Sequence, residues 1–438
     1  MVFHFVYYTV KIICLIGLKT PYYVIVPSMT TYTITEQNSV FSDLLFKLFS
    51  NDDVRTTKKD PFQVKKVSVS STDYKLVTYN EFKVTHSSIS DLGILRSVLF
   101  TKDNKMKCFS PPKSHHIDMF QGLYPEIKNV SVEEFIDGTM INVFWDEARD
   151  TWEIMTRKNI GANNSYYRYN KNIKQRSFNK LFFETFDKSK LEWDNLDKSC
   201  VYSFVMRHPE NRIIAYVNEP ELYLVEAYHI TSTINTDDIK QSKYEIFVVP
   251  RDYLQSSSTF TNSDVKFPKT FTFDSYSSLF SSAEEHSPNG NITKGYILRD
   301  NEKNIRSKVV TDEYTYVKDM KANIPDMRFL YLTLRNQRMI NKYLHYFPEH
   351  ENMFAHYYTF LQDYTHCLYS FYCDCYIKKN KPLKEYTSNF RTHMYKLHGI
   401  FMDNCRPQGR SLTLNDVMTY VNTMDVPLLF KTMFTAMN

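Results

Sequence analysis

VEEFIDGTMINVFW, residues 132 to 145, is the stretch of this sequence that decides the fold. Asp137-Gly138 is a dipeptide typical of tight turns, and the alternating apolar residues that follow it, from Met140 to Phe144, predict a strand. A turn that leads into a strand is common, so this pair alone says little about function. Its meaning depends on whether other segments of the chain stand in a matching order.

Composition sets the class of protein before any motif is considered. The chain has 438 residues with 42% hydrophobic side chains, enough for two or three domains with real cores. It has only 9 glycines, which argues against a glycine-rich phosphate loop or a dinucleotide-binding fold. The net charge of +5 is compatible with a polyanionic partner without requiring one, and the seven scattered cysteines favour a reducing, intracellular setting.

The N-terminal stretch from residue 3 to 18 is apolar but is interrupted by His4 and Lys11. It is too short to span a membrane comfortably, and a signal peptide would carry its basic residues before the apolar run. We therefore expect residues 1–40 to be an extension, with Met29 as an alternative start. We also expect a soluble protein without a membrane partner, located in the cytoplasm.

The rest of the chain divides by its hydrophobic period. Short runs with a period of two extend to about residue 320 and predict a mixed, largely antiparallel α+β domain over 41–320. Two serine-rich stretches, 255–263 and 274–286, are interpreted as surface loops. Beyond residue 320 apolar residues recur at helical spacing, so 321–438 is predicted to be an all-helical domain. Three prolines are expected between its helices: Pro348, Pro382 and Pro407.

Five segments occur in an order that resembles the motifs of bacteriophage-type RNA ligases, members of the covalent nucleotidyltransferase superfamily. They are FIDGT (135–139), TRKNIGA (156–162), YSFVMRHPENRIIAY (202–216), TKGYILRD (293–300) and RSKVVTDEY (306–314). The third segment keeps Asn211, Arg212 and Ile213 of the family pattern, and the C-terminal part resembles RNA-ligase-like proteins of nucleocytoplasmic large DNA viruses, which would place the protein in the host cytoplasm. The resemblance implies a nucleotidyltransferase-type, ATP-grasp-like ligase domain followed by the helical domain.

Such a resemblance implies a reaction in which a lysine attacks the α-phosphate of ATP and the adenylate then activates an RNA 5′-phosphate for joining to a 3′-hydroxyl. ATP and Mg²⁺ are the implied cofactors, and single-stranded or nicked RNA ends are the implied partner. This chain departs from the pattern where Phe135 replaces the lysine, Ser203 and Lys294 replace two glutamates, and Val310 replaces a second lysine, while Lys308 is kept. Four departures in register indicate either a rebuilt site or a catalytically inactive one.

Each candidate has a plain alternative. Residues predicted to contact the nucleotide are Phe135, Asp137, Gly138, Arg157, Lys158 and Lys294. An exposed basic pair such as Arg157-Lys158 is usually only a solvated surface. Lys113, in a basic segment just upstream of the first motif, is the first hypothesis for a relocated nucleophile, with Lys308 as a catalytic partner and Lys294 and Lys158 as reserves.

A second group of candidates concerns RNA. The stretch from 165 to 183 interleaves aromatic and basic residues, as single-stranded RNA binding requires, and its candidate contacts are Arg168, Lys171, Lys174 and Arg176. The alternative is a basic surface helix whose rings point into the core.

Two questions stay open at this point. The segment HCLYSFYCDC (366–375) and His115-His116 match no standard zinc spacing, so the identity of any metal is left unknown. The function is either RNA-ligase-like joining or a catalytically inactive RNA-binding or scaffold role, with a capping-type guanylyltransferase less favoured because it also needs the missing lysine.

Overall fold

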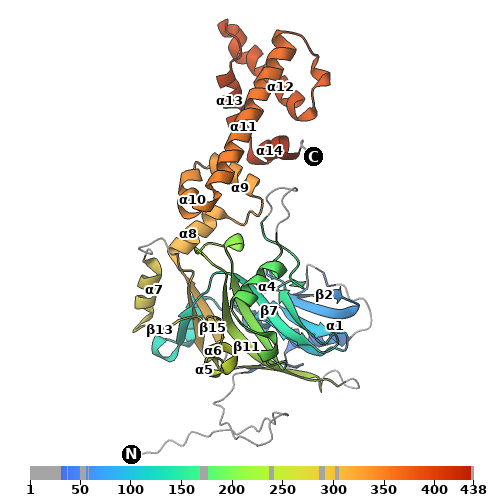
Figure 1. The fold of residues 1–438 in the computed structure, drawn as a ribbon, viewed down its shortest axis with the longest axis vertical. Coiled ribbons are helices and arrows are strands. Elements are labelled where there is room, and N and C mark those ends of the chain that lie inside the picture. The colour runs from blue at the N-terminus through green and yellow to red at the C-terminus, as the bar shows by residue number, and fades with distance from the viewer. Residues whose placement is uncertain are drawn as a thin grey trace, which may run out of the picture. The chain divides into compact units, whose positions relative to one another are not determined.

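The computed structural model describes residues 31–36, 38–49, 56–57, 59–167, 176–235, 241–285, 292–300 and 305–435 (Figure 1). The chain divides into two compact units. The first holds the described residues up to Ser165 and from Arg176 to Thr315, and the second holds Tyr166, Tyr167 and the described residues from Tyr316 onward. The division after Thr315 falls inside the helix Asp312–Lys321, so the predicted domain limits at 41 and 320 remain predictions.

The first unit is built on a seven-stranded antiparallel sheet. Its spatial order is β1 (Thr31–Ile34), β12 (Lys243–Val248), β11 (Glu221–Thr233), β10 (Cys200–Arg207), β7 (Thr139–Asp146), β8 (Thr151–Thr156) and β9 (Asn159–Ile160). Strand β10 is buried along almost its whole length because it lies in the middle of this sheet. Residues 31–34, which the sequence analysis assigned to the extension 1–40, pair in register with β12.

Two four-stranded antiparallel sheets complete the strands of this unit. One has the order β13 (Thr270–Phe271), β6 (Ser131–Glu134), β14 (Gly295–Asp300) and β15 (Ile305–Val310). The other has the order β2 (Phe62–Val69), β3 (Thr72–Tyr79), β4 (Val98–Thr101) and β5 (Met106–Phe109). The mixed antiparallel α+β architecture predicted from the sequence is therefore confirmed.

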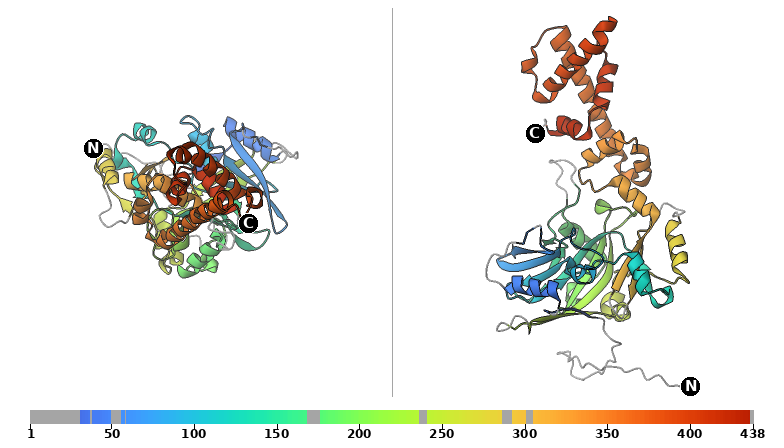
Figure 2. Two further views of the ribbon diagram at one scale, coloured as in Figure 1. Left: turned by 90° about the horizontal axis from the view of Figure 1, so that it is seen from above. Right: turned by 180° about the vertical axis from the view of Figure 1, so that it is seen from behind.

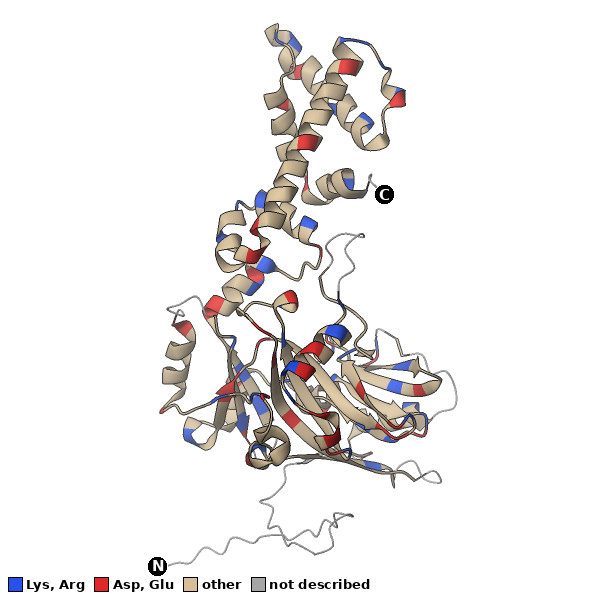
Figure 3. Ribbon diagram, viewed as in Figure 1, with Lys and Arg blue, Asp and Glu red and all other residues tan. Residues whose placement is uncertain are grey.

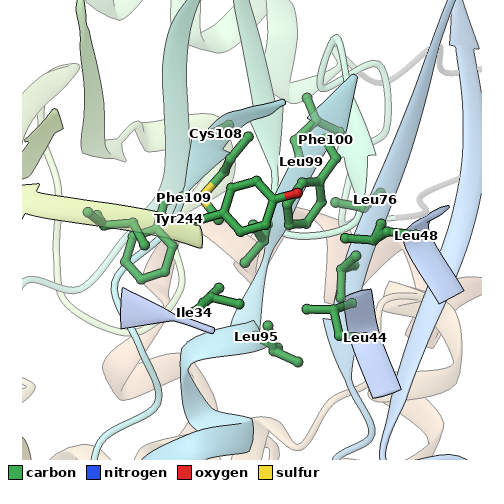
Figure 4. Close-up of a cluster of buried hydrophobic side chains, with 14 of the residues drawn as sticks. Ile34, Leu44, Leu48, Leu76, Leu95, Leu99, Phe100, Cys108, Phe109 and Tyr244 are labelled. Carbon is green, nitrogen blue, oxygen red and sulfur yellow. The ribbon is translucent and has the colours of Figure 1, made fainter. Parts of the chain in front are cut away.

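A large apolar core explains why the first described residues belong to the fold. Ile34 of β1 and Leu44 and Leu48 of helix α1 (Ser39–Phe49) are fully buried in one cluster with Phe109 and Tyr244 (Figure 4). Burying a side chain of this size contributes about 1.5–3 kcal/mol. The segment from residue 31 to 49 is held by these contacts and not by its own propensity.

The serine-rich stretches are not loops, which corrects the sequence interpretation. They contain helices α5 (Arg251–Ser256), α6 (Ser258–Thr261) and α7 (Tyr276–Glu284). Ser275 caps α7 in a capping box with Ser278, and Leu279 is fully buried. Serine at a helix N-terminus satisfies free backbone N–H groups, so serine richness here marks helix starts. Further short helices are α2 (Ile89–Leu92), α3 (Ile117–Leu123) and α4 (Phe178–Lys188).

The second unit is helical, as predicted (Figures 1 and 2). After α8 (Asp312–Lys321) come α9 (Met327–Asn336), α10 (Ile340–Tyr346), α11 (Glu351–Tyr372), α12 (Ser388–Ile400), α13 (Leu414–Asn422) and α14 (Val426–Phe430). Pro348, Pro382 and Pro407 lie between these helices, because proline cannot continue a helical hydrogen-bond ladder. Aromatic stacking holds the unit together: the Tyr343 ring lies 4.6 Å from Phe347 and 5.4 Å from Phe354.

Candidate functional site

Phe135 lies between β6 and β7, where the family pattern has its lysine. Its backbone N–H donates to the Gly295 carbonyl at 2.9 Å, which fixes it against β14. The ammonium of Lys294 lies 4.1 Å from the centre of the Phe135 ring, and that of Lys308 lies 5.9 Å from it. A cation over an aromatic face is attracted by the ring quadrupole. Lys294, directly before β14, and Lys308 of β15 are therefore gathered around Phe135.

Asp137 is a buried carboxylate that organises this group. One oxygen accepts the backbone N–H groups of Ile214 and Ala215 at 2.9 and 3.0 Å. The other accepts the Tyr314 hydroxyl at 2.6 Å and lies 3.5 Å from the Lys294 ammonium. Burial raises the pKa of Tyr314, and the Asp137 carboxylate raises it further, so the phenol stays protonated as a donor. Both oxygens of Asp137 are thus used inside the protein.

Gly138 allows the turn after Asp137 to approach β10 closely. A Cβ atom at this position would lie 2.5 Å from the Met206 carbonyl oxygen and 2.7 Å from Val205 Cγ1. No side chain larger than hydrogen fits there without movement. Packing against β10 therefore requires glycine at position 138, independently of any contact with a nucleotide.

The third motif places a polar pair, not a carboxylate, in the sheet. Ser203 is fully buried on β10 and donates to the Asn142 side-chain oxygen on β7 at 2.8 Å. The neighbouring position on β11 is Glu226, the backbone partner of Ser203. Glu226 lies in a buried ionic group with Arg299 of β14 and Arg306 of β15, whose guanidinium is 3.1 Å away. This carboxylate is already neutralised by two cations.

The charge state of Glu226 follows from those partners. Burial alone would raise its pKa, but Arg299 and Arg306 outweigh burial, and its pKa is lowered overall. The Tyr228 hydroxyl also donates to it. Two guanidinium groups and a phenol thus surround this carboxylate. The group joins the seven-stranded sheet to the sheet of β14 and β15.

Lys113 and Arg157 come together on a different ring. The Lys113 ammonium lies 5.3 Å and the Arg157 guanidinium 4.7 Å from the centre of Tyr79. Arg157 also pairs with Glu81 at 2.7 Å, and it lowers the pKa of that carboxyl, with smaller contributions from Lys158 and Lys113. The described contacts of Lys113 are with this group, whereas Lys294 and Lys308 face Phe135.

Most of the predicted RNA-binding residues fall outside the described part of the chain: Arg168, Lys171 and Lys174. Arg176 is described, and its guanidinium pairs with Glu184 and, at 2.7 Å, with Glu210. These two carboxylates neutralise Arg176 in the isolated protein. Of the four candidates, Arg176 is the one that the structure describes, and its charge is paired within the protein.

Sequence reasoning missed several partners in the site. Tyr314 stood inside the fifth motif, yet nothing in the local pattern indicated that its hydroxyl reaches Asp137. Glu226 and Asn142 were passed over because each lies on a strand whose register is set by distant pairing. Within the described residues, one group of three side chains has metal-ligating geometry: Asp197, Cys200 and His229, away from the predicted zinc candidates at 366–375.

Known proteins share limited similarity with this chain in sequence and in structure. No family model matches the chain. A segment of 96 residues is 31% identical to an RNA ligase of Rhodothermus phage RM378, and it spans 21% of each protein. The part that matches is thus about a fifth of the phage ligase, and the resemblance to viral proteins of large DNA viruses remains a prediction.

Solved structures of ligases are similar at low identity. A form 2 archaeal ATP-dependent RNA ligase shares 10% identity with a TM-score of 0.41, over 68% of this chain and 67% of that one. A mutant Naegleria gruberi RNA ligase with ATP and Mn shares 12% identity with a TM-score of 0.34, over 65% and 84%. Such scores add nothing on function. In the described parts of the chain, no helix is long and apolar enough to cross a membrane.

Proposed function

We propose that this protein is a ligase-fold phosphate-binding protein that holds RNA 5′-phosphate ends without forming a lysyl adenylate. The observation that carries the proposal is the position of Lys294, 4.1 Å over the Phe135 ring and 3.5 Å from Asp137. Phenylalanine has no lone pair to attack phosphorus. The ammonium beside it is stabilised in its charged form by a carboxylate, and a charged amine is not a nucleophile.

The pair of lysines supports anion binding. Lys294, directly before β14, and Lys308 of β15 converge on one ring, and the Lys308 residue is exposed. Lysine is a common phosphate ligand because its compact charge can meet any oxygen of the group. Lys and Arg residues are otherwise interspersed with Asp and Glu in the first unit (Figure 3), so the binding we propose is local.

The family's divalent metal does not fit this site. Its two glutamate positions hold Ser203, which is bonded to Asn142, and Lys294, whose positive charge would repel a cation. Glu226 is held by Arg299 and Arg306. We therefore derive no step through Mg²⁺, and we place ATP only as a competing phosphate ligand of Lys294 and Lys308.

RNA as the partner rests on similarity to the phage ligase and on the basic, aromatic stretch around Arg168 to Arg176. The 5′-phosphate is the chemical group by which a ligase-like protein would select an RNA end. In a partly desolvated site, phosphate contacts of this kind contribute several kcal/mol to the binding free energy. This contribution becomes smaller as salt is added.

The test compares binding of 5′-phosphorylated and 5′-hydroxyl RNA of one sequence. We expect the wild-type protein to prefer the phosphorylated RNA and the double variant Lys294→Gln, Lys308→Gln to lose that preference. A variant with the same loss of charge, Lys65→Gln with Lys102→Gln, removes two exposed lysines of the same unit and should keep it. Equal binding of both RNAs by the wild type would refute the proposal.

The second candidate is ATP-dependent RNA joining with Lys294 as the nucleophile. It is favoured by one observation, that the Lys294 amine is the one nearest to the vacated lysine position among the described contacts of Phe135. Incubation with α-labelled ATP and Mg²⁺, followed by a denaturing gel, separates the two. We expect no labelled band. A band that disappears in Lys294→Arg but survives in Lys113→Ala and Lys158→Ala would establish this second function instead.

A further inference from the structure

A group of metal-type ligands lies at the start of β10, outside every motif of the ligase pattern. Cys200 and His229 are direct cross-strand partners on β10 and β11, and Asp197 stands in the loop before β10. One ligand atom from each of the three residues lies within 4.8 Å of the others. The Cys200 sulfur is 3.4 Å from His229 Nε2.

The distance between Cys200 Sγ and His229 Nε2 matches the separation expected for two ligands of a tetrahedral metal ion. With a metal–sulfur bond of about 2.3 Å and a metal–nitrogen bond of about 2.0 Å, tetrahedral angles separate the two ligand atoms by roughly 3.5 Å. The observed 3.4 Å agrees with that value. The strand register therefore already sets the first two ligands at the separation that a bound ion would impose.

A second layer of hydrogen bonds orients the ligands. The Ser199 hydroxyl donates to Asp197 Oδ1 at 2.7 Å, and the Ser199 backbone N–H donates to the same oxygen at 2.8 Å. His229 Nδ1 lies 3.3 Å from the Ser199 oxygen, which can accept its proton. That arrangement leaves the Nε2 lone pair and Asp197 Oδ2 for an ion. Histidine ligands typically donate their other ring N–H in this way.

The group is separate from the Phe135 site. Successive side chains on a strand alternate between the two faces of a sheet, so Cys200 and Ser203 point to opposite faces, as do His229 and Glu226. Among the described contacts, the Asp197 carboxylate makes no ion pair with a Lys or Arg side chain. The Asp197 backbone N–H donates to the Tyr202 hydroxyl at 2.9 Å. Tyr202 shares the face of Cys200, and its ring lies 6.2 Å from that of Trp152.

We propose that Asp197, Cys200 and His229 bind a divalent transition-metal ion, Zn²⁺ by preference, with water as the fourth ligand. A thiolate, an imidazole and a carboxylate are a ligand set that suits zinc and disfavours Mg²⁺ and Ca²⁺, which prefer oxygen alone. Asp197 is exposed, so water and the ion can reach the site. The ion would tie the 197–199 loop to β10 and β11.

The experiment uses the full chain, stripped with a chelator and titrated with Co²⁺ as the probe. We expect one equivalent of Co²⁺ to bind with the charge-transfer absorption of a cobalt-bound thiolate, to quench tryptophan fluorescence, and to be displaced by Zn²⁺. Cys200→Ser should remove the charge-transfer band, and Asp197→Asn, a substitution at an exposed position, should weaken binding at least tenfold.

Two controls make the result specific. Cys405→Ser removes another buried free thiol and should leave binding unchanged. The triple variant Cys367→Ser, Cys373→Ser, Cys375→Ser removes the thiols of the 366–375 segment and should also bind normally. Absence of the thiolate band in the wild type, an unchanged band in Cys200→Ser, or its loss in the triple variant would each overturn the proposal.

Discussion

Removing the Asp137 side chain should destabilise the first unit strongly. In Asp137→Ala the N–H of Ile214, the hydroxyl of Tyr314 and the ammonium of Lys294 all lose their acceptor. Ile214 and Tyr314 are buried, so solvent cannot replace the lost bonds fully. Each buried donor left unsatisfied costs about 1–3 kcal/mol, so the two buried donors give roughly 2–6 kcal/mol for the variant.

Asp137→Asn offers a graded comparison. The asparagine side chain keeps the volume and can still accept hydrogen bonds through its one oxygen, but its NH₂ group then faces donors on the other side. We expect a loss of about 1–3 kcal/mol, between wild type and Asp137→Ala. Glu126→Ala removes an exposed carboxylate of the same unit whose side chain makes no capping hydrogen bond, and it should change stability by less than about 0.5 kcal/mol.

Urea unfolding followed by tryptophan fluorescence measures this unit alone. The chain has three tryptophans, Trp145, Trp152 and Trp193, and all belong to the first unit, so the signal is unaffected by unfolding of the helical one. A midpoint shift in Asp137→Ala no larger than that in Glu126→Ala would show that these hydrogen bonds do not hold the site together.

Three further outcomes are expected. Gly138→Ala should destabilise the first unit by about 1–3 kcal/mol because its Cβ meets backbone and side-chain atoms of β10, while Gly122→Ala, with nothing within 4 Å, should be nearly neutral in the same urea assay. The Arg410 guanidinium lowers the pKa of Asp416 to about 2. The pair therefore stabilises the helical unit at pH values above the ordinary pKa of 3.8, and this stabilisation is lost as the pH falls through 2. In circular dichroism melts, Asp416→Asn should lose less thermal stability between pH 4 and pH 2 than the wild type does. Neutralising Lys171, Lys174 and Arg176 together should weaken single-stranded RNA binding and reduce its dependence on salt, and an unchanged salt slope would assign this stretch to an ordinary surface.

The sequence predicted those parts of the fold that depend on local pattern. The presence of strands up to about residue 320 and the change to helices beyond it follow from the hydrophobic period, which can be read in a short window of sequence. Strand β1 was missed because its place depends on pairing with β12, more than 200 residues away. The helices of the serine-rich stretches were missed because serine was taken as a loop former, although it also begins helices.

Motif order selected candidate residues for the site but could not give their contacts. Phe135, Asp137 and Lys294 were all selected from motif order, and the structure brings them together. Lys113 was the first hypothesis for the nucleophile, yet its described ring contact is with Tyr79. Proximity along the chain suggested Lys113, whereas the distances that matter are set by the pairing of β6 with β14.

The stacking of Lys294 on Phe135 makes substitutions at these two positions depend on each other. Phe135→Lys as a first step would place a second ammonium about 4 Å from Lys294, at a repulsion of roughly 4 kcal/mol for an effective dielectric constant of 20. Replacing Lys294 by glutamate first would set a carboxylate beside Asp137, with a similar penalty. Each single step is unfavourable, and only the pair restores opposite charges. The two positions are therefore coupled by their charges, and the double substitution should cost less stability than the two single substitutions added together.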